Sequence, residues 1–288
     1  MRLKADLTLF TVAIIWGTGF IAQGIAGQHH IAYLYNGASF LLAALILLPF
    51  IRRGRKIPHG QWIWMLVAGV ILFAATALQQ VGLLYTKVAN AGFLTSLYAV
   101  CTPFLLWIGF REKPHWMDLV AVTAASLGAY FLSTAGQGFQ FQAGDSLELL
   151  GVLFWSAHFV VLGKYASRYD AITFAAGHFL VAGALNFVVG LAVENLSQLA
   201  SLPIIGATVY RAVLSVGLGY TLQVWGQRHT PPTDAALILG LEAVFAAVAA
   251  WLLLKQELLP IQIAGCAVIF AAVTFSQLKG LKNKGAHP

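Results

Sequence analysis

Long runs of apolar residues alternate with short polar breaks along the whole chain. Each run is close to the roughly 20 residues that a helix needs to cross the ~30 Å hydrocarbon layer of a bilayer. The runs are too long and too evenly apolar for barrel strands, which alternate apolar and polar positions over about 10 residues. The pattern therefore predicts ten membrane-spanning helices, at residues 7–26, 31–50, 62–85, 91–110, 117–134, 146–163, 171–193, 207–226, 235–254 and 261–279.

The basic residues lie in the polar breaks and fall mostly on one side of this arrangement. If the amino terminus is cytoplasmic, fourteen of the 17 lysines and arginines face the cytoplasm, with the densest group between Arg52 and Lys56. The other side holds Lys87, Arg211 and Lys255. Because cytoplasmic loops of membrane proteins carry an excess of lysine and arginine, both termini are predicted to be cytoplasmic.

Composition agrees with a membrane protein whose main solvent is the lipid bilayer. Hydrophobic residues make up 59% of the 288 residues, charged residues make up 9%, and the mean hydropathy is +0.80. A typical soluble domain carries about 25% charged residues. The net charge of +7 is spread over separate loops rather than one basic face, so we expect no nucleic-acid partner. Cys101 and Cys266 lie in different apolar runs, and no nucleotide-binding motif is present, so we expect no metal, no cofactor and no ATP-driven pump.

The second half of the chain repeats the first. Trp-Gly-Thr-Gly-Phe at 16–20, in the first predicted span, matches Trp-Ser-Ala-His-Phe at 155–159, in the sixth, and Asn90 matches Asp234. Because five spans are an odd number, the second unit enters the membrane from the opposite face. Inverted repeats are common in transporters, with the substrate site near mid-membrane and alternating access by rocking of the two units. A duplicated scaffold without transport is the alternative. The predicted fold is one all-α membrane domain of two inverted five-helix repeats, 1–137 and 138–288.

Four features together resemble the EamA-type branch of the drug/metabolite transporter superfamily. They are the 5+5 plan, the Trp-Gly-x-x-Phe opening, Asn-Ala-Gly-Phe-Leu-Thr-Ser-Leu-Tyr at 90–98, and Leu-Gly-Leu-Glu-Ala-Val-Phe at 239–245 leading to Lys-Gln-Glu at 255–257. The chain is similar in particular to YddG-type aromatic amino acid exporters. The resemblance implies an exporter in the bacterial inner membrane, in which spans one to four and six to nine ring a central cavity while spans five and ten stand outside. Many relatives carry proline directly after the span-nine glutamate, where this chain has Ala243.

Glu242 is interpreted as the single carboxylate well inside a span. An ionisable group at such depth costs a few kcal/mol and usually faces a cavity or a partner. It is therefore the candidate for proton coupling or for binding an ammonium group. The alternative is a structural hydrogen bond to a neighbouring helix. Tyr98 holds nearly the same position in the first repeat, so the two side chains are predicted to flank one site.

Embedded rings and polar groups supply the other candidate residues for a substrate cavity. Rings can stack on an apolar or cationic group, and amides and imidazoles can bind a polar head. Packing and interhelical hydrogen bonds are the competing explanation for the histidines and amides. The candidate cavity residues are Trp16, Phe20, Gln79, Tyr98, Trp155, His158, Phe159, His178, Tyr220, Gln223 and Glu242.

Pro103 interrupts the fourth predicted span and leaves the carbonyl of Ala99 without its helical donor, so a kink is expected there. The ninth span has no proline at the matching place and is expected to run smoothly. We interpret its alanines, from Ala243 to Ala250, as sites of close helix packing. A kinked fourth span opposite a smooth ninth one would make the halves unequal, which is a hypothesis for gating.

The function best supported is a secondary transporter that exports amino acids, aromatic or hydrophobic ones in particular, or similar small amphipathic molecules. A multidrug or organic-cation exporter that uses Glu242 in proton antiport is the alternative. A membrane-embedded enzyme is disfavoured because such chemistry generally needs clustered carboxylates and a divalent metal. The aspartates of this chain are instead scattered, at Asp6, Asp118, Asp145, Asp170 and Asp234. The sequence is also compatible with a homodimer.

Overall fold

A computed structural model describes residues 1–51 and 57–282. Within these ranges every secondary-structure element is a helix, and ten spans are long and apolar enough to cross a membrane. They follow the predicted spans in number and order, which confirms the all-helical membrane fold. The predicted cytoplasmic charges Arg52, Arg53, Arg55, Lys56 and Lys284 lie outside the described residues.

Several spans consist of more than one helix. The fourth span joins α4 and α5, the eighth joins α9, η4 and α10, and the ninth joins α11 and α12. The helices of the first half are α1 (Arg2–Gln28), α2 (Tyr33–Leu47), η1 (Leu48–Phe50), α3 (His59–Gly82), α4 (Val88–Ser96), α5 (Tyr98–Phe110) and α6 (Trp116–Thr134). Those of the second half are α7 (Asp145–Lys164), η2 (Ala166–Arg168), α8 (Ala171–Val193), η3 (Leu196–Ala200), α9 (Leu202–Tyr210), η4 (Arg211–Tyr220), α10 (Thr221–Gly226), α11 (Pro232–Leu239), α12 (Glu242–Leu254) and α13 (Pro260–Lys282).

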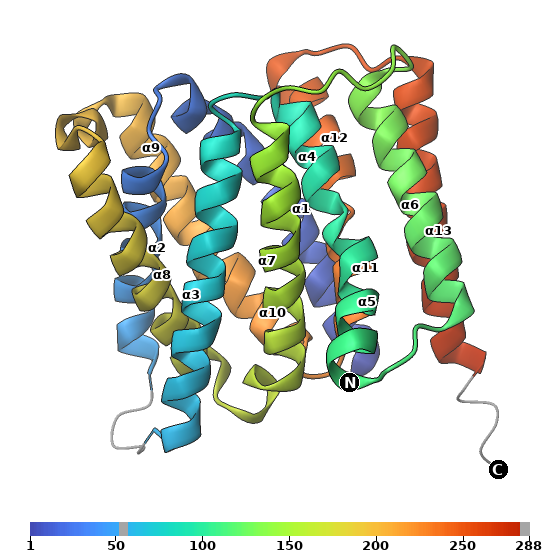
Figure 1. Ribbon diagram of the computed structural model, residues 1–288, viewed down its shortest axis with the longest axis horizontal. Coiled ribbons are helices and arrows are strands. Elements are labelled where there is room, and N and C mark those ends of the chain that lie inside the picture. Colours follow the sequence, from blue (N-terminus) through green and yellow to red (C-terminus); the bar gives the residue numbers. More distant parts are fainter. Residues whose placement is uncertain (52–56, 283–288) are drawn as a thin grey trace.

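The two halves interlock rather than stand side by side. Helix α1 packs against α12 and α10 of the second half, while α7 packs against α3, α4 and α5 of the first. Helices α2 and α8 pack on each other toward one side of the bundle, and α6 and α13 pair at the opposite edge (Figure 1). The start of α1 and the end of α13 lie at the same end of the bundle (Figure 1), as an even number of spans requires.

The outer pair α6 and α13 is held close by two glycines. A Cβ atom on Gly128 would lie 2.7 Å from the carbonyl oxygen of Gly265, and one on Gly265 would lie 2.5 Å from the carbonyl oxygen of Gly128. Small residues let two helix backbones approach in a membrane, where packing replaces the hydrophobic effect between helices. Spans five and ten thus stand outside the central bundle, as the family resemblance implies.

Spans four and nine are both interrupted halfway, at matching positions of the two repeats. Helix α4 ends at Ser96 and α5 begins at Tyr98, while α11 ends at Leu239 and α12 begins at Glu242. The expectation of a smooth ninth span was therefore wrong. Leu97 and Leu241 have almost the same backbone angles, φ −65° and ψ −9° against φ −62° and ψ −13°, so a tight turn forms without proline. Pro103 lies inside α5, beyond the break, and its part in gating stays a prediction.

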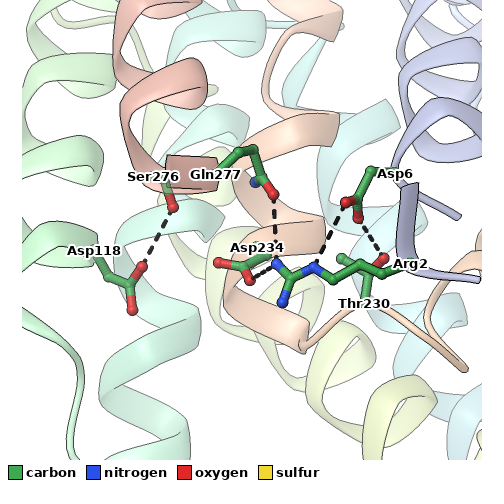
Figure 2. Close-up of polar contacts among 7 residues, drawn as sticks. All are labelled: Arg2, Asp6, Asp118, Thr230, Asp234, Ser276 and Gln277. Carbon is green, nitrogen blue, oxygen red and sulfur yellow. Dashed lines mark hydrogen bonds and ion pairs between the residues drawn. The ribbon is translucent and has the colours of Figure 1, made fainter. Parts of the chain in front are cut away.

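Charged and polar residues join α1 to the start of α11 and the loop before it, at the end of the bundle that carries the amino terminus. The guanidinium of Arg2 forms ion pairs with Asp6 and Asp234, and Thr230 Oγ1 donates to Asp6 Oδ1 at 2.7 Å. Figure 2 shows Arg2 reaching between the two carboxylates, with Gln277 of α13 close by. Two aspartates that are 228 residues apart in the sequence are thus brought together by folding.

The opposite end of the bundle has a related cluster at the equivalent positions of the two repeats. Thr86 Oγ1 and Asn90 Nδ2 both donate to the carboxylate of Asp145, the Asn90 bond being 3.3 Å long. Asp145 begins α7 as Asp6 lies in the first turns of α1, and Asn90 holds the place of Asp234. A threonine–aspartate hydrogen bond therefore ties a loop to the first helix of each repeat, at opposite ends of the bundle.

Candidate functional site

A small cavity of about 40 Å³ lies among the helices near the middle of the spans. At roughly 10–15 Å³ per enclosed water, it has room for a few water molecules. Spans one, three and four and their repeat partners six, eight and nine provide its walls. Spans two and seven pack behind these walls, which corrects the expectation that they border the cavity. The lining residues are Trp16, Phe20, Gln23, Gln79, Thr95, Tyr98, Trp155, Phe159, Arg211, Ser215, Tyr220 and Glu242.

Eight of the eleven candidate residues chosen from the sequence line this cavity. Six of them form three pairs related by the repeat. Trp16 and Phe20 match Trp155 and Phe159, 139 residues later, and Tyr98 matches Glu242, 144 residues later. An inverted repeat places equivalent residues around a common axis at mid-membrane. The sequence repeat therefore indicated which side chains meet in the centre.

Tyr98 and Glu242 touch across the cavity. Tyr98 Oη donates to Glu242 Oε1 at 3.0 Å, and the two side chains are 1% and 5% exposed. Each is the first residue of its half-helix, α5 or α12. The breaks in spans four and nine therefore lie directly beside the two side chains that meet in the cavity. The two residues paired in the sequence analysis thus meet in the cavity, and that they flank a substrate site stays a prediction.

Aromatic rings surround the cavity, and Tyr220 lies at their centre. Its ring centroid is 4.7 Å from that of Trp16 and 6.3 Å from that of Trp155, which is nearly parallel at 7°. On the other wall the rings of Tyr98 and Phe159 lie 4.7 Å apart. Flat rings at these distances pack well against one another and present π faces to a ligand. The walls thus suit an aromatic or aliphatic side chain.

Arg211 was missed as a site residue, because the sequence analysis counted it among the charges of the outer side. Its side chain is buried, with 5% exposed, and it lines the cavity near the middle of span eight. The guanidinium lies over the ring of Tyr35 at 4.9 Å and that of Phe40 at 5.6 Å. The sequence feature that could have identified Arg211 is its position inside an apolar run, because an ionisable residue in such a run is a functional candidate.

A second acidic side chain near the cavity, Glu148, is also buried, but it lies close to the end of its span rather than well inside it. Glu148 lies in the first turn of α7 and is 1% exposed. Thr95 Oγ1 donates to Glu148 Oε2 at 3.3 Å and accepts from Gln79 Nε2 at 2.9 Å. The sequence placed Glu148 at the edge of a span, whereas α3 and α4 cover that edge in the folded protein. A chain of polar groups therefore connects the cavity to a buried acid.

Three predicted site residues do not border the cavity. His158 and His178 are fully buried behind Tyr220, with ring centroids 5.7 Å apart, and His178 Nδ1 bonds to the carbonyl of Phe174 at 2.8 Å. Gln223 is also fully buried. It holds the place of Gln79, 144 residues later, and the position equivalent to Thr95, which bonds to Gln79, is the apolar Leu239. A role for these three in substrate binding stays a prediction.

A larger cavity of about 450 Å³ adjoins the central one on the side away from the termini. We refer to it as the outer vestibule. Phe20 lines both cavities, and the vestibule wall includes Gly24, Val88 and Ala243. Four of the span-nine alanines that were expected to serve helix packing also line this vestibule; they are Ala243, Ala246, Ala247 and Ala250. Their small side chains leave the open volume, and Phe20 stands between that volume and the centre.

A duplicated ten-span bundle around a polar cavity with aromatic walls has the architecture of a secondary transporter. Comparison with known families supports this class, because the sequence profile of the EamA-like transporter family matches residues 3–134 and again residues 142–277. The chain belongs to that family, and it is a transporter rather than an enzyme. The double match also agrees with the duplicated halves.

Individual relatives place the chain within a broad group. It is 32% identical over 279 residues to an uncharacterized transporter of Archaeoglobus fulgidus, covering 96% of this chain and 87% of the relative. It is 27% identical over 164 residues to the threonine/homoserine exporter RhtA of Escherichia coli K12, covering 56% and 55%. A solved crystal structure has the same fold, with a TM-score of 0.77 and 18% identity over 98% of this chain and 99% of that one.

Proposed function

We propose that the protein exports small zwitterionic amphipathic molecules, amino acids with aromatic or hydrophobic side chains in particular, by alternating access. The observation that carries the proposal is the central cavity, in which Glu242 and Arg211 provide opposite charges and Trp16, Trp155 and Tyr220 provide ring faces. An amino acid has two opposite charges on one carbon atom beside an apolar side chain. The partial similarity to a threonine/homoserine exporter supports the same class of substrate.

The alternative, an exporter of organic cations that uses Glu242 alone, is disfavoured by Arg211. A cation in a cavity of this size would lie close to a buried guanidinium, and like charges in a medium of low dielectric repel strongly. Glu242 remains the candidate for proton coupling in either case, since a carboxylate can release a substrate ammonium group when it takes up a proton.

Alternating access is supported by a difference between the two repeats. A Cβ atom on Gly24 of α1 would lie 3.5 Å from Val88, an ordinary contact distance. A Cβ atom on Gly163, the repeat partner of Gly24, would lie 2.5 Å from Pro232, the partner of Val88. The helices are thus further apart at Gly24 and Val88, where the vestibule lies, than at the equivalent pair Gly163 and Pro232. In our proposal the wider and the closer arrangement change places between the two repeats during transport. We also propose that the protein lies in the cell membrane with both termini in the cytoplasm.

The test is counterflow in liposomes that contain the purified full-length protein. Liposomes are loaded with unlabelled phenylalanine or threonine, and uptake of the same labelled amino acid is measured with and without a pH gradient. We expect saturable uptake that protein-free liposomes lack. Uptake that responds to the gradient indicates proton coupling, and uptake that ignores it indicates a facilitator. Counterflow of tetraphenylphosphonium together with none for any amino acid would refute the proposal.

A further inference from the structure

Arg211 is a buried cation that lacks the partner such a group usually has. Within residues 1–51 and 57–282, no carboxylate forms an ion pair with its guanidinium. An arginine near the centre of a membrane helix costs about 2.5–3.5 kcal/mol by insertion measurements, and such residues normally pair or face water. The contacts of Arg211 to Tyr35 and Phe40 compensate in part, since a cation over a ring is worth about 0.5–2 kcal/mol.

The hydrogen bonds of the guanidinium leave capacity for a ligand. Arg211 Nη1 donates to Gln80 Oε1 at 3.4 Å, at the long end of the range for such bonds. A guanidinium carries five N–H donors in a planar fork that fits a carboxylate with two parallel bonds. Because Arg211 lines the central cavity, the donors on that side can meet a molecule that enters it.

The backbone of span eight is built so that Arg211 faces the cavity. Arg211 begins the π-helical segment η4, in which each bonded N–H lies five residues after its carbonyl. This wider helix places Arg211, Ser215 and Tyr220 on the same face, and all three line the cavity. The segment is anchored by Trp16, whose Nε1 donates to the carbonyl oxygen of Ser215 at 2.9 Å. Such π segments are rare and are found frequently at functional sites.

The repeat shows that this cation belongs to one half alone. The offset of 144 residues that relates Gln79 to Gln223 pairs Arg211 with Val67, which is apolar. Glu242 likewise has an uncharged partner, Tyr98. The positive charge of Arg211 and the negative charge of Glu242 therefore make the lining of the cavity asymmetric between the two repeats.

We propose that Arg211 binds the carboxylate of the transported molecule while Glu242 binds its ammonium group. This inference rests on the proposed function and makes it narrower, because it requires a free carboxylate on the substrate. The substrate side chain then lies among Trp16, Trp155 and Tyr220. Since the cavity of about 40 Å³ is too small for an amino acid, binding includes movement of Phe20 toward the outer vestibule.

The experiment compares ligands that differ only in the carboxylate. Counterflow of labelled phenylalanine into liposomes is inhibited with unlabelled phenylalanine or with phenylalanine amide, which keeps the amine and the ring. For the wild-type protein we expect phenylalanine to inhibit at concentrations at least roughly 10-fold lower than the amide, the value of one charged hydrogen bond. This comparison needs no variant and therefore no assumption about folding.

Variants then assign the preference to Arg211. In Arg211→Gln the half-inhibitory concentration of phenylalanine should rise roughly 10- to 100-fold while that of the amide stays the same, and Arg211→Lys should keep part of the preference. Lys87→Gln, which removes an exposed cation just before α4, is the control and should behave as wild type. Equal inhibition by phenylalanine and its amide in wild type, or an unchanged preference in folded Arg211→Gln, overturns this inference alone. Absence of counterflow for every amino acid overturns the proposed function and this inference with it.

Discussion

Gly17 sets the distance between α1 and the half-helix that begins at Glu242. A Cβ atom on Gly17 would lie 2.5 Å from Phe245 Cβ, 2.7 Å from the backbone nitrogen of Ala246 and 2.8 Å from the carbonyl oxygen of Glu242. Ordinary contacts of a Cβ atom begin near 3.4 Å. Two of the three neighbouring atoms belong to the backbone and cannot rotate away. In Gly17→Ala the two helices must therefore separate by about 1 Å, at a cost of roughly 1–3 kcal/mol for overpacking.

A second glycine provides the matched control for this substitution. Gly206 lies in α9, and a Cβ atom there would meet nothing within 4 Å. Alanine in a helix is favoured over glycine by about 1 kcal/mol, and both variants gain this term. The difference in stability between Gly17→Ala and Gly206→Ala therefore measures the packing cost itself, about 1–3 kcal/mol.

The assay is the fraction of purified protein that stays monodisperse in detergent after heating, followed by counterflow in liposomes. Gly17→Ala should lose this fraction at a temperature several degrees below that of Gly206→Ala. Its transport should also fall, because the added methyl group displaces the backbone of Glu242, whereas Gly206→Ala should transport as wild type. If Gly17→Ala resists heating as well as the control and transports equally well, the close approach of α1 and α12 does not position Glu242.

Three further substitutions test individual contacts. Glu242→Gln keeps the shape of the side chain but cannot bind a proton or an ammonium group; counterflow should fall at least roughly 10-fold and lose any response to a pH gradient, and unchanged transport would remove Glu242 from the mechanism. Tyr98→Phe removes the 3.0 Å bond to Glu242 and should slow counterflow by roughly 10-fold, as expected for about 1–2 kcal/mol at a charged acceptor; a wild-type rate would mean that the bond is incidental. Arg2→Gln breaks the ion pair with buried Asp234 and should lower the heating midpoint in detergent, while Lys4→Gln, an exposed charge in the same turn, should not; equal midpoints would show that the cluster adds no stability.

Local pattern and the repeat predicted the spans and most of the residues that line the central cavity. Span length and apolar content depend on residues that are neighbours in sequence, so ten helices follow from the chain alone. The match of Trp16 and Phe20 with Trp155 and Phe159 relates equivalent positions in two copies of one unit, and such positions meet at the axis between them. Tyr98 and Glu242 were paired by the same argument, and their hydrogen bond bears it out.

Which face of a helix meets the cavity depends on neighbours far away in sequence. Arg211 faces inward because η4 is a π-helix anchored by Trp16, and no local pattern distinguishes that segment from an ordinary α-helix. Glu148 is buried because α3 and α4 cover the first turn of α7. His158 and His178 lie behind Tyr220 although they are as deep in the bundle as Tyr98. Apolar side chains point toward lipid and toward protein alike in a membrane, so hydrophobicity cannot tell the two directions apart, and packing between distant helices settles the choice.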